Sequence, residues 1–312
     1  MNRAFRWASI STSLVLLFGC GPQSASDSGA AKTEVRRLVA IGDIHADLDA
    51  ARHAFRLAGG IDEDGNWVGG SLTIVQLGDF IGRSYEDREV LDFILDVRER
   101  ARLAGGTVHV LIGNHEVFGV RTELRWVHRD AFAAFEGMSD LHLDSDYIEH
   151  VPIEARARSA ALMPGGLYAR RLAEFPAVLR LGETIFAHGG VTPHWAEYGI
   201  ERINEEVNRW FAGEISEPPS ARGMDPGNFD DSVMMSRHFS DDVDDDDCAM
   251  LSESLDLLRA KRMIVAHTVQ NSITSHCDGR VWVVDVGMSR YYGGVIQVLE
   301  ILDDETVSVI SQ

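Results

Sequence analysis

Five short segments of the chain are mostly apolar and rich in β-branched residues, and each leads through a small residue into a polar one. They cover residues 38–41, 72–77, 108–112, 184–187 and 263–266. Apolar runs without alternation are typical of strands that are covered on both faces. Ligands of open α/β sheets bind beyond the carboxyl ends of the strands. We therefore expect the polar residues after these strands to meet at one rim: Asp43, His45, Asp79, Asn114, His188 and His267.

The segments between and after these strands predict helices and further strands. Asp47 is a typical N-cap, because apolar residues follow it at helical spacing. The same spacing predicts helices around 90–101 and 251–258, and residues 119–181 predict a mostly helical, cap-like insertion. Three later runs suggest a second sheet: 281–284, 295–298 and 307–309.

The charge of the chain argues against nucleic acid as a main partner. Its 312 residues include 29 Lys and Arg against 49 Asp and Glu, which gives a formal net charge of −20. Proteins that bind phosphate backbones concentrate basic residues instead. A phosphate-bearing substrate is not excluded by this charge, because a bound metal ion can invert the local field.

The N-terminus resembles the signal of a bacterial lipoprotein. Residues 1–19 combine a basic start with an apolar stretch that is too short to span a hydrocarbon core of roughly 30 Å. The segment ends in Leu17-Phe18-Gly19-Cys20, which resembles a lipobox, so we expect lipidation of Cys20. Residues 20–35 then form a flexible tether and 36–312 the folded domain. This predicts a protein that is anchored by lipid to a membrane of the bacterial cell envelope and faces the periplasm or exterior; an ordinary cleaved signal is the alternative.

The residue types at the predicted rim suit a pair of divalent metal ions. Carboxylate, imidazole and amide oxygen are ligands of metals such as Mn, Fe or Zn. Six such side chains are enough for two ions, and we choose Asp79 as the residue whose two oxygens bridge them. Two ions roughly 3.5–4 Å apart can make hydroxide from water and assist an in-line displacement at phosphorus. The sequence therefore predicts metal-dependent phosphoryl chemistry.

Five ordered motifs resemble those of the calcineurin-like metallophosphoesterases: GDIH (42–45), GDFIGR (78–83), GNHE (113–116), HGG (188–190) and AHT (266–268). Further segments are similar to the Shewanella-like protein phosphatases of the phosphoprotein phosphatase branch: Arg125-Trp126, Lys261-Arg262-Met263, Asp285-Val286-Gly287-Met288-Ser289 and Tyr292-Gly293-Gly294. The resemblance covers about residues 36–302. It implies an α/β fold, namely a four-layer α/β/β/α sandwich with two central mixed sheets and a helical cap insertion.

The resemblance also assigns roles to single residues. The ligands it implies are Asp43, His45 and Asp79 for the first ion, and Asp79, Asn114, His188 and His267 for the second. A metal-bound hydroxide would attack phosphorus in line, and His115 would protonate the leaving oxygen as general acid. Arg83 would bind phosphate oxygens with its planar guanidinium, and Arg237 would supply a second guanidinium.

Two positions depart from the family pattern GDxxDRG: Gly82 stands where the family has an aspartate, and Ser84 replaces a turn glycine. In the family that carboxylate orients the catalytic histidine, so its loss threatens His115 and not the metal ligands. If no other group supplies the contact, Gly82→Asp is expected to raise kcat on substrates with poor leaving groups.

These observations favour a two-metal phosphomonoesterase that acts on a phosphoprotein or phosphopeptide. A rival hypothesis is the same chemistry on a nucleotide, such as a dinucleoside polyphosphate. A rival of another class is a catalytically weakened metal-binding or interaction lipoprotein, for which Gly82 is the best argument. The choice between phosphotyrosine and phosphoserine or phosphothreonine stays open, although loss of the aspartate favours aryl leaving groups and hence phosphotyrosine.

Two other features each have two interpretations. Cys248 and Cys277 either form a disulfide in an oxidising compartment or stay as buried thiols. The acidic run 241–247 is a solvated loop or a calcium site, and we favour the loop because the run lacks the glycine and terminal glutamate of an EF-hand.

Overall fold

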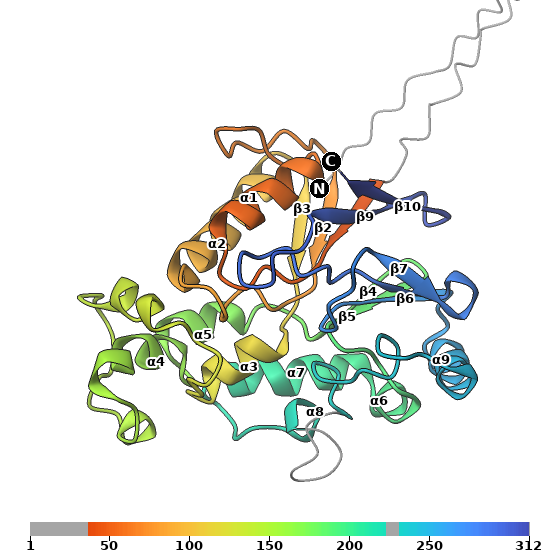
Figure 1. Cartoon of the computed structure of the whole chain (residues 1–312). Coiled ribbons are helices and arrows are strands. Elements are labelled where there is room, and N and C mark those ends of the chain that lie inside the picture. Colours follow the sequence, from red (N-terminus) through yellow and green to blue (C-terminus); the bar gives the residue numbers. More distant parts are fainter. Residues whose placement is uncertain (1–36, 223–230, 312) are drawn as a thin grey trace, which may run out of the picture. The chain divides into compact units, whose positions relative to one another are not determined.

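The computed structural model describes residues 37–222 and 231–311, which all belong to one compact unit, Val35–Gln312. Two five-stranded sheets form its centre (Figure 1). The strands of the first sheet, in spatial order, are β10 (Thr306–Ser311), β9 (Gln297–Leu302), β1 (Arg37–Ile41), β2 (Thr73–Gln76) and β3 (Thr107–Val110). Strands β1, β2 and β3 are parallel, whereas β9 is antiparallel to both of its neighbours. In the parallel part, Val39 pairs with Ile74 and Ile74 with Val108.

The second sheet has three parallel central strands and two antiparallel edge strands. Its order is β4 (Val178–Leu181), β5 (Thr184–Ala187), β6 (Arg262–Val265), β8 (Val281–Val283) and β7 (Thr274–His276). The predicted grouping of the three C-terminal runs was wrong, because only 281–284 contributes a strand to this sheet. The other two runs lie in β9 and β10 of the first sheet, where β9 pairs with β1 more than 250 residues earlier in the chain. Such long-range pairing leaves no local signal in the sequence.

Helices cover the outer faces of the two sheets (Figure 1). Helices α1 (Leu48–Leu57) and α2 (Asp87–Leu103) pack on the first sheet. Helices α6 (Pro193–Tyr198), α7 (Ile200–Phe211) and α9 (Asp245–Leu258) lie on the side of the second sheet. The predicted N-cap is confirmed, since the side chain of Asp47 accepts a hydrogen bond from the backbone N–H of Ala50 at 3.0 Å. The architecture is the predicted α/β/β/α sandwich.

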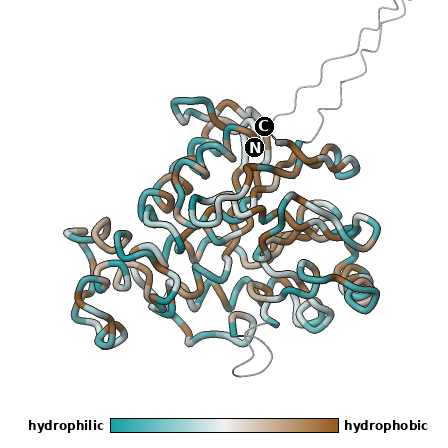
Figure 2. The backbone as a smooth tube through the Cα atoms, viewed as in Figure 1, coloured by the Kyte–Doolittle hydropathy of each residue, from teal (hydrophilic) through white to brown (hydrophobic). Residues whose placement is uncertain are grey.

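The apolar segments of both sheets contribute to one buried core (Figure 2). Strands β1, β2, β5 and β6 are almost wholly buried, as expected of runs without alternation. Among the residues that the structure describes, no helix is long and apolar enough to cross a membrane.

The segment predicted as an insertion is mostly helical. It holds the last two residues of α3 (Asn114–Val120), four 3-10 turns (Arg129–Ala131, Ala133–Phe135, Asp146–Ile148 and Ile153–Ala155), α4 (Arg156–Leu162) and α5 (Leu167–Leu172). A small core of its own holds part of it together: Phe132, Ile148, Val151, Ala155, Ala160 and Met163. The last four residues of the predicted range form edge strand β4, so the helical part ends before Val178. A short helix, α8 (Pro219–Arg222), follows later in the chain.

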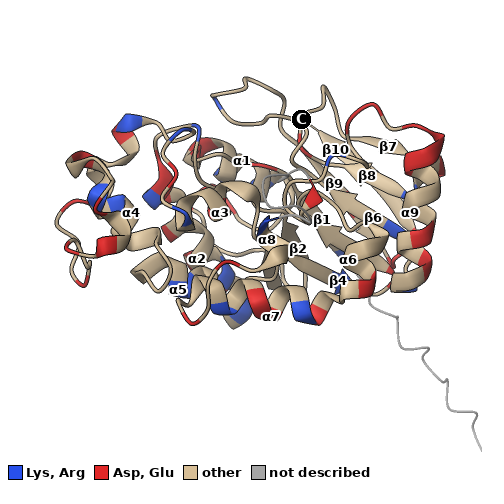
Figure 3. Ribbon diagram, turned by 90° about the horizontal axis from the view of Figure 1, so that it is seen from below, with Lys and Arg blue, Asp and Glu red and all other residues tan. Residues whose placement is uncertain are grey.

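The two features left open by the sequence are resolved near α9. Cys248 and Cys277 form a disulfide that ties this helix to the segment between β7 and β8. The acidic run begins the helix, because the side chain of Asp244 accepts hydrogen bonds from the backbone N–H groups of Asp246 and Asp247. Acidic residues at a helix N-terminus are also favoured by the helix dipole. Figure 3 shows acidic residues along α9.

Candidate active site

Five strand ends from both sheets bring the six predicted metal ligands together. Asp43 and His45 follow β1, Asp79 follows β2, Asn114 follows β3, His188 follows β5 and His267 follows β6. The predicted single rim is therefore formed by strand ends of both sheets. Five of the six residues are at most 5% exposed: Asp43, His45, Asp79, Asn114 and His188.

The loops that carry these residues adopt an unusual backbone conformation. His45, Asp79 and His267 have positive φ angles of 49°, 52° and 67°, and Arg83 has 68°. Non-glycine residues seldom adopt the left-handed region, and such residues cluster at functional sites. The surrounding hydrogen bonds must therefore hold these loops in place.

Two buried side chains supply those hydrogen bonds. The side chain of Gln76 donates to the carbonyls of Gly42 and Gly78 and accepts from the N–H of Gly78, which joins the ends of β1 and β2. The carboxylate of Glu116 accepts from four backbone N–H groups, those of Gly113, Asp79, Phe80 and Ile81, at 2.8 to 3.3 Å. Burial, followed by the charge of Asp79, raises the pKa of Glu116 to about 8. Glu116 is the last residue of the GNHE motif (113–116), and no role was predicted for it from the sequence.

One group of ligand atoms surrounds the amide of Asn114. Its side-chain oxygen lies 2.9 Å from Nε2 of His188, 2.9 Å from Nδ1 of His267 and 3.1 Å from Oδ2 of Asp79. An amide oxygen that faces only lone pairs gains nothing from hydrogen bonding. A cation between these atoms would explain the arrangement, and imidazole, carboxylate and amide are suitable ligands.

A second group of ligand atoms lies on the other side of Asp79. Nε2 of His45 is 3.6 Å from Oδ2 of Asp43 and 3.8 Å from Oδ2 of Asp79. Nε2 of His115 is 3.9 Å from the same Asp79 oxygen, whereas Oδ1 of Asp79 is 3.3 Å from Nε2 of His188. Asp79 thus presents Oδ2 to His45 and His115 and Oδ1 to His188, and both oxygens lie within 3.3 Å of the Asn114 side chain. It is the residue shared by both candidate metal-binding groups of the described chain, His45–Asp79–His115 and Asp79–His188–His267.

The electrostatics of the site favour bound cations. Burial raises the pKa of Asp43 well above its usual range, and the charges of Asp285 and Asp79 add to this. Burial also lowers the pKa of His45 to about 4, so its ring is neutral with a free lone pair at neutral pH. Burial acts against the charge of Asp79, but His188 and His115 outweigh it and hold the pKa of Asp79 well below its usual value. Dications would stabilise the clustered carboxylates and need neutral imidazoles, so the residues fit divalent metal ions.

Asp285 is a carboxylate next to the metal ligands that the chemical argument missed. It is 1% exposed and accepts a hydrogen bond from the N–H of Gly287 at 2.9 Å. Burial raises its pKa to about 6. Only the resemblance had pointed to this segment, because Asp285 follows strand β8 without a motif of its own.

Arg83 is surrounded by aromatic rings. Its Cζ atom lies 4.2 Å from the ring centroid of Trp126, 5.3 Å from that of Tyr291 and 5.8 Å from that of Tyr292. Trp126 comes from the helical insertion, and its carbonyl accepts the backbone N–H of Arg83 at 2.7 Å. The three rings were not predicted as site residues, because a single aromatic residue in a loop carries no pattern.

The second predicted arginine also lies at the rim. The Nη1 atom of Arg237 donates to Oγ1 of Thr268 at 2.8 Å, directly beside His267, and the residue is exposed. Both predicted guanidinium groups therefore belong to loops that border the ligand cluster, and their contact with phosphate stays a prediction.

The structure corrects the expectation for Gly82. A Cβ atom at this position would lie 2.2 Å from Nδ1 of His115 and 3.1 Å from its Cε1 atom. The φ angle of +78° is also unfavourable for any other residue. An aspartate at 82 would displace His115 instead of orienting it, so the predicted gain from Gly82→Asp is wrong for this loop.

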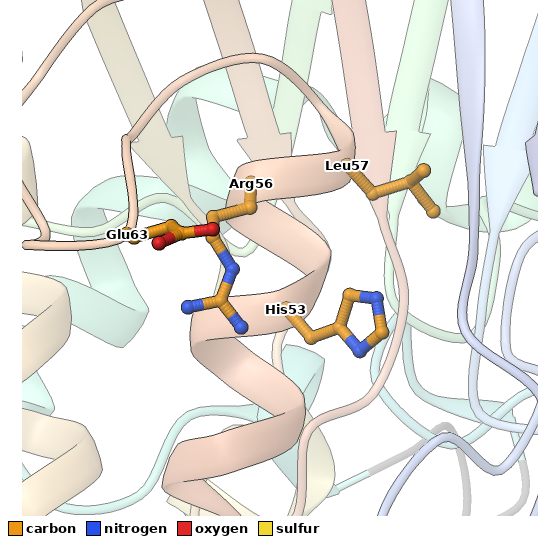
Figure 4. Close-up of a pocket in the computed structure, with 4 residues that line it drawn as sticks. All are labelled: His53, Arg56, Leu57 and Glu63. Atoms are coloured by element: carbon orange, nitrogen blue, oxygen red, sulfur yellow. The ribbon is translucent and has the colours of Figure 1, made fainter. Parts of the chain in front are cut away.

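Two surface pockets lie away from the ligand cluster. One, of about 600 Å³, is lined by His53, Arg56, Leu57 and Glu63 on and after α1 (Figure 4). The other, also about 600 Å³, runs along edge strand β3 and includes Arg98. Neither contains a predicted site residue. The predicted lipidation site Cys20, with residues 1–35, lies outside the described residues.

Comparisons with known proteins agree with this geometry. The sequence profile of the family "Calcineurin-like phosphoesterase" matches residues 36–271, a range that contains all six predicted ligands. The chain is 36% identical over 308 residues to Shewanella-like protein phosphatase 2 of Arabidopsis thaliana, covering 88% of this chain and 77% of that protein. It is 26% identical over 281 residues to Shewanella-like protein phosphatase 1 of Plasmodium berghei, covering 88% and 74%. Among solved structures, a cold-active protein-tyrosine phosphatase of a psychrophilic Shewanella species has the same fold, with a TM-score of 0.65, 22% identity and coverage of 88% and 80%.

Proposed function

Because this chain belongs to the calcineurin-like phosphoesterases, and within them to the Shewanella-like protein phosphatases, it is a metal-dependent phosphatase, and we propose that its substrate is a phosphoprotein or phosphopeptide. The observation that carries the proposal is the position of Asp79 between two groups of ligand atoms. A shared carboxylate of this kind suits two neighbouring divalent ions. The relatives with informative names are protein phosphatases, which supports a phosphorylated polypeptide as the substrate.

The residues of the chain divide the work at this site. Bound divalent ions would neutralise phosphate oxygens and lower the pKa of water, and the six predicted ligands would hold them. Arg83 and Arg237 would bind the phosphate from the two borders of the cluster. His115 would donate a proton to the leaving oxygen. Burial lowers the pKa of His115 well below its usual value, but an arriving phosphate adds negative charge and favours the protonated ring.

The aromatic surroundings of Arg83 favour phosphotyrosine over phosphoserine. Tyr291 is 55% exposed and Tyr292 39% exposed, so both rings are accessible beside the arginine. A substrate phenyl ring can stack against such rings, and aromatic pairs are worth about 0.5–1.5 kcal/mol beyond the buried area. A serine side chain has no ring to make this contact. The Shewanella phosphatase of the same fold is a protein-tyrosine phosphatase, which supports this preference.

A substrate panel tests the proposal. The full chain is loaded with Mn²⁺ and given a phosphotyrosine peptide, the same peptide with phosphoserine, and a dinucleoside polyphosphate. The proposal expects turnover of both peptides, with the higher kcat/KM for phosphotyrosine. Faster turnover of the dinucleotide would favour the nucleotide hydrolase. Two bound ions without turnover of any substrate would favour the metal-binding lipoprotein.

The cellular location belongs to the same proposal. Lipidation of Cys20 would anchor the chain to a membrane of the cell envelope, with residues 20–35 as tether. The Cys248–Cys277 disulfide supports an oxidising compartment outside the cytoplasm. Labelled fatty acid should be incorporated into the wild-type protein and not into Cys20→Ala. Absence of label in the wild type would refute the anchor and leave the cleaved signal.

A further inference from the structure

A buried ion pair connects the helical insertion to the loop that carries Arg83. Nε of Arg158, in α4, lies 2.5 Å from Oδ2 of Asp87, the first residue of α2. Arg158 is 1% exposed and Asp87 is fully buried. Most other ion pairs of the described chain lie at the surface, where a pair contributes little to stability. This one is enclosed by protein on all sides.

The other oxygen of the same carboxylate holds the catalytic loop. Oδ1 of Asp87 accepts the backbone N–H of Gly82 at 2.7 Å. Gly82 in turn lies directly against the ring of His115, with no room for a Cβ atom between them. Arg83 is the next residue in the chain. A continuous series of contacts therefore runs from Arg158 through Asp87 to Gly82 and the imidazole of His115.

Stability alone does not account for this pair. Removing two charges from water costs several kcal/mol per ion, and apolar residues of similar volume are often as stable or more so. The pair is also incompletely satisfied, since Nη1 of Arg158 is buried and has no hydrogen-bond partner among the described residues. The pair therefore contributes little to stability, and its role is better explained by the loop geometry at Gly82 that it fixes.

We infer that Asp87 and Arg158 are positioning residues for the proton donor. They hold the backbone at Gly82 against His115 and thereby restrict the position of its ring, where the family has an aspartate. The inference rests on the proposed role of His115 as general acid. It also makes the insertion part of the catalytic apparatus, because Arg158 belongs to α4.

The test compares Arg158→Met with Arg158→Lys on substrates of different leaving group. Loss of the ion pair should free the loop and misplace His115, and a misplacement of about 1 Å can cost about 100-fold in rate. We expect kcat for an alkyl phosphate to fall roughly 10- to 100-fold in Arg158→Met. For p-nitrophenyl phosphate, which needs little protonation, the fall should be several-fold smaller. Arg158→Lys, which keeps the charge, should recover part of the alkyl activity.

Arg262→Met is the matched control. Arg262 is 8% exposed and pairs with Asp304 at 3.2 Å, at the end of β6 remote from His267. The Arg262→Met variant should have a lower melting temperature than the wild type but the same ratio of alkyl phosphate to aryl phosphate turnover. If Arg158→Met lowers both activities equally, or neither, the positioning role is refuted and the pair is merely structural.

A second measurement separates failure of the inference from failure of the proposed function. If His115→Asn affects alkyl and aryl phosphates equally, His115 is not the general acid. In that case a crystal structure of Arg158→Met tests whether the Asp87–Arg158 pair positions the loop. A displaced segment 82–84 supports this positioning role, and an unchanged segment overturns it.

Discussion

Replacing Gly82 with alanine adds a single carbon atom in contact with the proposed proton donor. The new Cβ would lie 2.2 Å from Nδ1 of His115, which is far inside van der Waals contact. Forcing extra volume into a packed site costs roughly 1–3 kcal/mol. The positive φ of +78° adds about 1–2 kcal/mol for a residue with a Cβ. We therefore expect a loss of about 2–5 kcal/mol in the free energy of unfolding.

His115 can relieve the overlap only by moving, so activity should fall as well. A shift of about 1 Å corresponds to roughly a 100-fold loss of kcat. The loss should be greater for an alkyl phosphate than for p-nitrophenyl phosphate, and Gly82→Asp should behave like Gly82→Ala. Urea unfolding, steady-state kinetics and metal analysis of each purified variant measure these effects.

Gly65→Ala is the control for the backbone contribution. Gly65 has a similar φ of +80°, but an added Cβ would meet nothing within 4 Å. This variant should show only the strain of about 1–2 kcal/mol and a normal kcat. If Gly82→Ala matches Gly65→Ala in stability and keeps the wild-type kcat, or if Gly82→Asp raises kcat, the described contact with His115 does not exist.

Three further changes test other parts of the account. Cys248→Ser should lower the free energy of unfolding by roughly 3–4 kcal/mol in urea, since the bridge to Cys277 closes a loop with a sequence separation of 29; equal stability with and without reductant would contradict this. In the chelated protein, burial raises the pKa of Asp285 from its usual 3.8 to about 6, so the folded state binds this proton more tightly than the unfolded state. The contribution of this carboxyl to stability should therefore be complete below about pH 4 and fall by roughly 3 kcal/mol as the pH rises through 6, and Asp285→Asn should lose this part of the pH dependence in thermal scans. Trp126→Ala should raise KM for a phosphotyrosine peptide about 2- to 10-fold more than for the phosphoserine peptide, because the ring beside Arg83 is lost, and an equal change for both would refute the aromatic contact.

The positions of the six candidate ligands could be predicted because each residue sits at a strand end inside a short local pattern. Asp79 follows a buried strand and a glycine, and this local pattern can be recognised without knowledge of the tertiary structure. The positions of Asn114 and His188 follow from the same rule. A local pattern does not indicate which sheet a strand joins. For this reason the runs 295–298 and 307–309 were assigned to the wrong sheet.

The supporting residues could not be predicted, since their partners lie far away in the chain. Arg158 is 71 residues from Asp87, and nothing in either neighbourhood indicates the contact. Gly82 shows the same limit: the sequence reveals the missing carboxylate, but only the fold shows His115 occupying the space. Residues such as Glu116, which holds backbone N–H groups, become visible only when the loops are in place.

The central claim is that Asp79 lies between two metal ions in an active phosphatase. Anomalous diffraction from crystals of the Mn²⁺-loaded protein measures this directly. In the wild-type protein we expect two peaks, one between Asp79 and His45 and the other among Asp79, Asn114 and His188. In Asp79→Asn we expect the loss of both ions or of most of their occupancy. A single ion, ions bound away from Asp79, or an Asp79→Asn protein with two ions and normal turnover would contradict it.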